Sequence, residues 1–177
     1  MKINITNLSA QSLGRAIAQI QQFAAKLNSD ADTFANQLAG IGQLTASYWY
    51  STDKDYEPRT DANVAVSVQK NQNAQNSYAL TATGKAVAFL EFGAGITYSG
   101  NAHPWNGKVT PPMGPGTYPG AGHWKDPGGW YVPGTYDPSK KRSIKTLGNP
   151  PTKAMYNAFE TMKQKNVYQP LAKQIFT

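Results

Sequence analysis

The sequence predicts an α+β fold, in which a long N-terminal amphipathic helix packs on a small antiparallel β-sheet, followed by a long Gly/Pro/aromatic loop insertion and a C-terminal helix. Three observations predict this fold: a helical spacing of apolar residues near the N-terminus, a period-two alternation after residue 63, and the placement of 22 of the 28 Gly and Pro residues between Gly93 and Pro151. At 177 residues we expect one domain. Its expected parts are a helix and β-meander core over 1–92, an ordered extended loop over 93–150 and a helical segment over 151–177.

The first helix is predicted by an apolar stripe whose members alternate four and three residues apart, which places them on one face. The stripe comprises Leu13, Ile17, Ile20, Ala24, Leu27, Ala31, Phe34, Leu38 and Ile41. Asn7 or Ser9 can cap its start, and Gly40 and Gly42 mark its expected end, after about eight turns. A coiled-coil seam and packing across a sheet are both open; the alanines in the stripe favour the sheet.

Three short strands are expected next. Residues 44–51 hold bulky aromatics that favour strands, residues 64–69 alternate Val with smaller or polar side chains, and residues 77–83 form a returning strand. A polar turn over 71–76 joins the last two. Residues 82–92 fit either a short helix or a strand.

The Gly/Pro-rich segment contains three of the four tryptophans and both histidines. Aromatic residues interrupt it every few positions, and disordered segments have few aromatics, so we expect an ordered loop with a short strand over 129–132. Its aromatic residues either form the loop's own core, bind a second subunit or stack on sugars. The candidates for contact between subunits are Trp105, Tyr118, Trp124, Trp130 and Tyr131.

A helix is expected near the C-terminus. Asn149 can cap it, and Pro150 and Pro151 suit its first turn. Pro170 is expected to interrupt this helix or to begin a new one.

The sequence offers no motif for catalysis. It has no cysteine, its two histidines, His103 and His123, are too far apart for a typical metal motif, and no GxSxG, HExxH or phosphate-binding glycine motif is present. We therefore predict a protein that is not an enzyme and has no catalytic residue, cofactor or metal. The acidic residues between 53 and 61 are expected to form a solvated loop.

Glu91 lies inside the apolar run AVAFLEFGAGI. An isolated buried charge is costly, so this carboxylate is either exposed on one face or paired. The paired alternative is a clamp, in which Glu91 accepts hydrogen bonds from loop N–H groups or from Arg or Lys. Glu91, Phe92 and Gly93 would then anchor the Gly/Pro segment to the core.

The charge is uneven along the chain. Residues 1–95 carry seven basic and seven acidic groups, whereas residues 96–177 carry ten and three, which accounts for the whole net charge of +7. A cluster at Lys140, Lys141, Arg142 and Lys145 is either a solvated surface or a contact for DNA or an acidic partner. No signal peptide or membrane span is recognisable, so we expect a soluble protein made in the cytoplasm.

The ordered series of motifs resembles the HK-97 gene-product-ten-like family of tailed-phage neck, head–tail connector and tail-completion proteins. The matching residues are Glu91-Phe92-Gly93, then Trp130-Tyr131, then Pro150 or Pro151 leading into a helix with Met155 and Ala158. The resemblance implies a non-catalytic structural protein in the virion neck of a siphophage, assembled in the host bacterial cytoplasm. It also implies a homo-oligomeric ring around the DNA channel, which would contact neighbouring neck, head-completion or tail-terminator proteins and passing DNA without sequence specificity, and no membrane.

Three alternatives remain. The chain could form the tail-terminator ring of the same neck. It could be a carbohydrate-binding module that uses Trp105, Trp124 and Trp130, or a non-specific nucleic-acid binder that uses the basic cluster.

Overall fold

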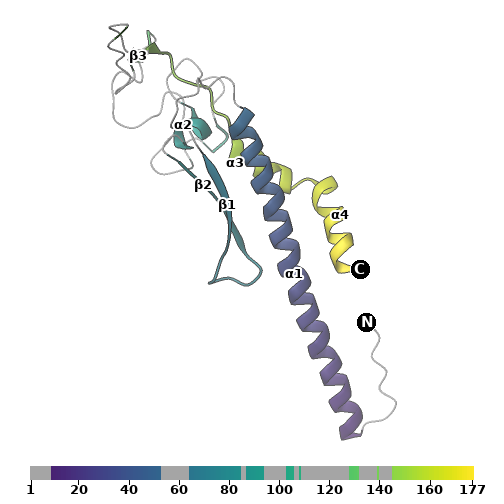
Figure 1. Ribbon diagram of the computed structural model, residues 1–177. Coiled ribbons are helices and arrows are strands. Elements are labelled where there is room, and N and C mark those ends of the chain that lie inside the picture. The colour runs from purple at the N-terminus through teal and green to yellow at the C-terminus, as the bar shows by residue number, and fades with distance from the viewer. Residues whose placement is uncertain are drawn as a thin grey trace.

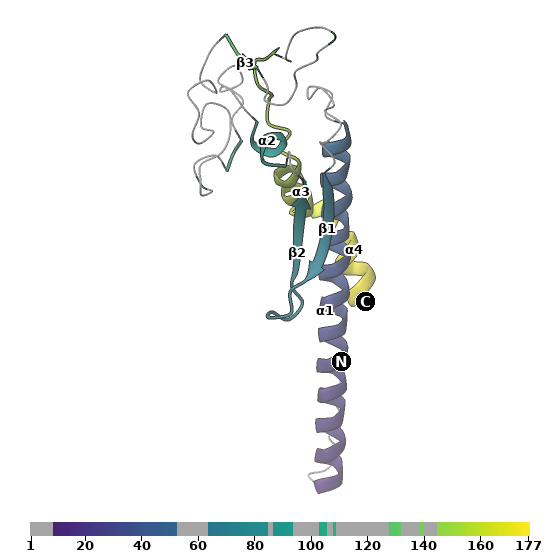
Figure 2. The same cartoon turned by 60° about the vertical axis from the view of Figure 1, so that its left-hand side comes forward.

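The computed structural model describes residues 9–52, 64–84, 87–93, 103–105, 108, 128–131, 139 and 145–177. Their fold is α+β, as predicted: a long N-terminal helix, a two-stranded antiparallel sheet and C-terminal helices (Figure 1). Helix α1 (Ala10–Thr52) is the longest element, and the hairpin and the C-terminal helices pack against it. Strands β1 (Ala65–Lys70) and β2 (Tyr78–Thr83) run beside its C-terminal part, as do the C-terminal helices (Figure 2).

Helix α1 begins where the sequence predicts and ends later. The Ser9 hydroxyl accepts a hydrogen bond from the Ser12 amide at 3.2 Å, which is the expected cap. The helix then continues through Gly40 and Gly42 to Thr52, 43 residues or about twelve turns. The predicted stop at the two glycines and the predicted strand over 44–51 are therefore wrong.

The longer helix follows from its packing. Ala46 of α1 is buried in one core with Val66 of β1 and Ala158 of helix α3 (Ala154–Met162), and Tyr50 packs against this core. A Cβ atom on Gly42 would lie 2.7 Å from the Met162 sulfur, so glycine here permits the close approach of α3. Because these α1 residues recur every four positions, only a helix turns them all toward the same core.

The two predicted strands after residue 63 are confirmed. They pair antiparallel, with Ala65 opposite Thr83 and Lys70 opposite Tyr78. The intervening turn contains Asn76 with φ 53° and a hydrogen bond from the Asn73 amide to the Asn71 side-chain oxygen at 3.0 Å. The predicted three-stranded meander is a two-stranded hairpin, because its first member belongs to α1.

Polar contacts attach the hairpin to α1. The Lys70 ammonium lies 2.7 Å from the Asp32 carboxylate, and the Tyr78 hydroxyl donates to the same carboxylate at 3.1 Å. The Lys70 hydrogen bond is the main cause that lowers the pKa of Asp32. Further along, the Gln43 amide donates to the Val66 carbonyl at 2.7 Å.

The remaining elements are short. Helix α2 (Val87–Phe92) shows that residues 87–92 of the ambiguous segment are helical, whereas residues 82 and 83 belong to β2. Strand β3 (Trp130–Tyr131) forms the expected strand by pairing antiparallel with β4 (Lys145–Thr146). Helix α4 (Lys165–Phe176) follows α3.

Pro170 lies inside α4, so the predicted interruption there is wrong. The chain breaks instead between α3 and α4, around Lys163 and Gln164. Tertiary contacts flank the proline and outweigh the cost of its missing N–H group. Leu171 beside it is buried, and the Phe176 ring lies 5.8 Å from that of Phe34 on α1.

The apolar stripe of α1 is only partly covered. Phe34 meets α4, whereas earlier members of the stripe, from Leu13 to Leu27, are exposed. In both cartoon views this N-terminal part extends beyond β1, β2 and α4 (Figures 1 and 2). The expectation that the stripe packs across a sheet is therefore wrong for its first half. In the described part of the chain, no helix is long and apolar enough to cross a membrane.

Candidate functional site: a buried carboxylate that joins three segments

Glu91, near the end of α2, is the centre of the most connected polar cluster in the described residues. The residue is 4% exposed, and its carboxylate accepts four hydrogen bonds. One oxygen, Oε2, accepts from the Tyr50 hydroxyl at 2.8 Å and the Met155 amide at 3.0 Å. The other, Oε1, accepts from His103 Nε2 at 2.9 Å and the Tyr156 amide at 3.1 Å. Each oxygen thus has two donors, which offsets the cost of burying the charge.

Two of these bonds cap helix α3. Lys153 at the N-cap position has φ 58° and makes no side-chain cap. Met155 and Tyr156 are the second and third residues of the helix, whose amides an N-cap side chain normally satisfies. The Glu91 carboxylate takes that role from a distant segment and brings a negative charge to the positive end of the helix dipole.

The carboxyl end of α2 is held in return by the segment before α3. The Thr152 amide donates to the Leu90 carbonyl at 2.7 Å, and the Asn149 side chain donates to the Phe89 carbonyl at 2.8 Å. Asn149 therefore satisfies the end of α2, and the expectation that it caps the C-terminal helix is wrong. Gly93 closes α2 with φ 76°, a left-handed conformation that favours glycine, and its amide donates to the Phe89 carbonyl.

His103 connects the Gly/Pro-rich segment to the same carboxylate. The Trp105 amide donates to His103 Nδ1 at 3.0 Å, so the ring proton lies on Nε2 and points to Glu91. The residue is 2% exposed, and its ring centroid lies 4.6 Å from that of Phe92. The clamp predicted for Glu91 thus has different donors: a loop histidine, a tyrosine of α1 and two helix amides, in place of loop amides, Arg or Lys.

The electrostatics of the cluster reflect a balance between burial and hydrogen bonding. Burial raises the pKa of Glu91, but the bonds from His103, Met155, Tyr50 and Tyr156 together outweigh it, so the pKa lies below its ordinary value. Burial also raises the pKa of the Tyr50 hydroxyl, and the adjacent negative carboxylate raises it further. Both shifts favour the state shown by the geometry, an ionised Glu91 that accepts from a protonated Tyr50.

Trp105 packs within its own chain. Its ring centroid lies 5.5 Å from Tyr156 and 5.9 Å from Phe159, both on α3. Of the other predicted contact residues, Trp130 and Tyr131 form β3, while Tyr118 and Trp124 lie outside the described residues. The structure therefore places one predicted contact residue, Trp105, in a self-packed aromatic cluster.

The basic cluster lies mostly outside the described residues. Lys145 is exposed on β4, and Lys140, Lys141 and Arg142 are not described.

Sequence reasoning identified Glu91 and missed its partners. Tyr50 falls in the predicted strand over 44–51, and the sequence pattern indicates no partner for His103. The usable signal for Tyr50 was its spacing of four residues from Ala46, which continues a helical face.

The arrangement suits a structural joint. The four donors occupy both oxygens of Glu91, and the carboxylate ties α1, α2, α3 and the start of the Gly/Pro segment together. Within the described ranges, no group of three His, Cys, Asp or Glu side chains could hold a metal ion.

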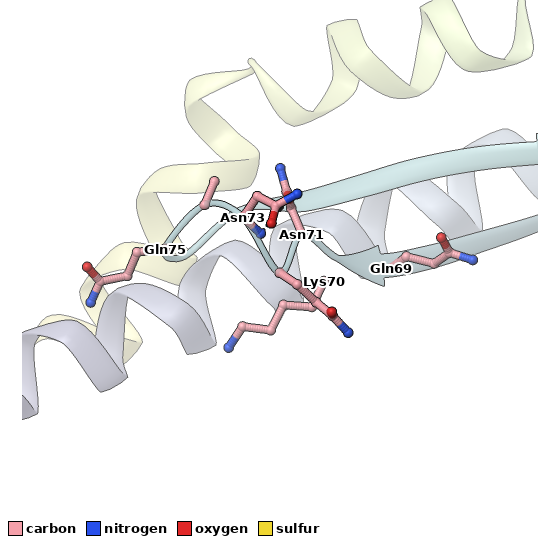
Figure 3. Close-up of a pocket in the computed structure, with 7 residues that line it drawn as sticks. Gln69, Lys70, Asn71, Asn73 and Gln75 are labelled. Carbon is pink, nitrogen blue, oxygen red and sulfur yellow. Dashed lines mark hydrogen bonds between the residues drawn. The ribbon is translucent and has the colours of Figure 1, made fainter.

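A surface hollow lies elsewhere, at the hairpin turn, lined by residues 69–75 (Figure 3). Its labelled side chains point in different directions, and all of its described lining residues come from one turn and its strand ends. It therefore lacks convergent polar groups of the kind that a binding site presents.

Comparisons with protein-family models, with curated proteins and with solved structures found no match to this chain.

Proposed function

We propose that this chain is a structural protomer of the neck of a long-tailed bacteriophage. In this role it is a head–tail connector or tail-completion protein, whose copies form a closed ring around the DNA channel and join head to tail. Such a ring is built from head-to-tail contacts between identical subunits that close on themselves. The tail-terminator ring of the same neck is the nearest alternative, and position in the particle distinguishes the two.

The observation that carries the proposal is the order of motifs along the chain. Glu-Phe-Gly, Trp-Tyr and a Pro-led helix follow one another as in the neck family that the sequence resembles. Two of these motifs are in direct contact in the structure. Glu91 of the Glu-Phe-Gly motif caps α3, which is the helix that follows the prolines. A buried carboxylate that holds several segments together supports a structural role for the protein.

The carbohydrate-binding alternative gains no support from Trp105. A stacking platform needs an available aromatic face, and the Trp105 ring is engaged by two aromatic residues of α3. Trp124 and the side chain of Trp130 lie outside the described part of the chain.

The proposal is tested by deleting the gene from the phage that carries it. We expect filled heads and free tails that fail to join, or tails of abnormal length. Purified wild-type protein added to the deletion lysate should restore infectious particles, and imaging should locate it between portal and tail tube. Normal infectious particles from the deletion, or a location away from the neck, would refute the proposal.

A further inference from the structure

The N-terminal part of α1 carries an apolar face whose large side chains are exposed, although Ala16 on its flank is buried. This free seam consists of Leu13, Ile17, Ile20, Ala24 and Leu27, with Phe23 on its flank. The large members, Leu13, Ile17, Ile20, Phe23 and Leu27, are 41%, 56%, 53%, 47% and 46% exposed, respectively. Together they expose on the order of 400 Å² of apolar surface, which is in the range of the largest apolar patch on a typical monomer, a patch that is often functional.

The seam extends in phase with a packed one. Phe34, further along the same stripe, is covered by Phe176 of α4, and Asp32 is held by the hairpin through Lys70. The N-terminal part of α1 extends beyond these elements (Figure 2). An isolated helix is only marginally stable in water, and most helices are stabilised by packing of their apolar face. The free part of α1 therefore has the surface of a helix that packs on another helix.

We propose that the free seam binds a second copy of this chain, with the two α1 helices antiparallel and crossing at Gln22. Residues that repeat every 3.5 positions form such two-helix contacts. In this register Ile20 lies opposite Ala24 of the second copy and Ile17 opposite its Leu27. Leu13 lies opposite Ala31 of the second copy. Large side chains therefore face small ones in two layers, Ile20 with Ala24 and Leu13 with Ala31.

The length of the free segment fits this register. Leu13 lies opposite residue 31 of the second copy, where the covered part of its helix begins. The overlap from 13 to 31 spans about 27 Å of helix, so the free segments pair while the two packed bodies lie at opposite ends. The antiparallel arrangement also places opposite ends of the helix dipoles side by side.

Phe23 and the charges favour the same arrangement. Phe23 flanks the seam, and antiparallel pairing about Gln22 brings the two Phe23 side chains together across the two-fold axis. A parallel pair would place Phe23 opposite the polar Asn28.

Between residues 10 and 29 the only charged residues are Arg15 and Lys26, both away from the seam, so two copies meet without facing like charges.

The expected dimer is weak. Standard stable interfaces bury about 800 Å² on each partner, roughly twice the apolar area exposed here. The inference is independent of the neck proposal, because it concerns the purified chain. The contact can therefore fail while the neck function holds, or hold while the neck function fails, and separate experiments distinguish these outcomes.

Disulfide trapping tests the contact directly, because the chain contains no cysteine. Full-length Ile20→Cys and Ala24→Cys proteins, one carrying a size tag, are mixed and oxidised. We expect the mixed disulfide to form about tenfold faster than the Gln22→Cys self-disulfide, since residue 22 faces away from the seam. All three substitutions are at exposed positions, and helix content by circular dichroism verifies that each variant is folded.

Two results would overturn the proposal. Mixed disulfides no faster than the Gln22→Cys control would show that the seam does not bind a second copy, and Ile20→Cys or Ala24→Cys linking fastest to itself would show a parallel pair. Sedimentation gives a second measurement: the mass should rise from 19.2 kDa toward twice that value with concentration, and Ile17→Glu should abolish the rise. A wild-type mass of 19.2 kDa up to about 1 mM protein would also overturn it.

Discussion

Replacing Glu91 by glutamine tests whether the buried charge holds the joint. The substitution keeps the shape of the side chain and exchanges one accepting oxygen for an NH₂ group, which donates. On the Oε2 side, the Tyr50 hydroxyl can turn to accept from this group, but the Met155 amide cannot. At least one buried backbone N–H therefore loses its acceptor.

The magnitude follows from the contacts. An unsatisfied buried N–H costs about 1–3 kcal/mol, and the loss of a negative charge at a partly buried helix N-terminus costs up to about 2 kcal/mol. A neutral amide is easier to bury than a carboxylate, which offsets part of this cost. We expect Glu91→Gln to lower the free energy of unfolding by about 3 kcal/mol, which corresponds to a fall in Tm of roughly 6–12 °C.

The matched control is Glu160→Gln. Glu160 lies on the exposed side of α3, its side chain is 41% exposed, and among the described residues it pairs with Lys163 at 3.0 Å. Such surface pairs contribute little, so this variant should stay within about 0.5 kcal/mol of wild type. Urea unfolding of both variants, with unchanged m values, gives the comparison.

The pH dependence adds a second check. The folded-state pKa of Glu91 lies below its ordinary value of 4.5. The stability that the charge contributes is therefore present above about pH 4.5 and is lost as pH falls through the folded-state pKa. The difference between wild type and Glu91→Gln should be constant near neutrality and shrink in acid. Equal stability of Glu91→Gln and Glu160→Gln at pH 7 would refute the reasoning.

Three further perturbations test other contacts. Tyr50→Phe removes one of four donors to the buried carboxylate and should lower the free energy of unfolding by about 1.5–3 kcal/mol at pH 7. Because the folded-state pKa of Tyr50 is raised, the stability of wild type should fall above pH 10 by more than the stability of this variant. Gly42→Leu should lower the free energy of unfolding by about 1–3 kcal/mol, because it overpacks against α3. Gly42→Ala should change this free energy by less than about 1 kcal/mol, because the flexible end of Met162 can move and alanine favours the helix. Equal costs for the two variants would contradict the packing argument. Asp32→Asn should lower Tm only slightly, and the effect should diminish in high salt, because its partner Lys70 is exposed; thermal unfolding at two salt concentrations measures this.

The sequence by itself determined the features that depend on local patterns. The spacing of apolar residues predicted a helix with one apolar face, the Val alternation predicted β1, and the polar run over 71–76 predicted its turn. A lone glutamate in an apolar run predicted either exposure or a set of partners. Each of these inferences uses residues only a few positions apart, and backbone sterics and side-chain periodicity act over that range.

The tertiary structure alone decided which partners each face meets. Glu91 finds its donors 12, 41, 64 and 65 positions away, and no local pattern specifies donors at such separations. Residues 44–51 are helical because Ala46 and Tyr50 must reach a shared core, which outweighs the strand preference of the aromatics. Pro170 is tolerated inside α4, whose contacts flank it. The same stripe of α1 is covered at Phe34 and exposed at Ile17, because periodicity identifies an apolar face and only the packed chain determines what covers it.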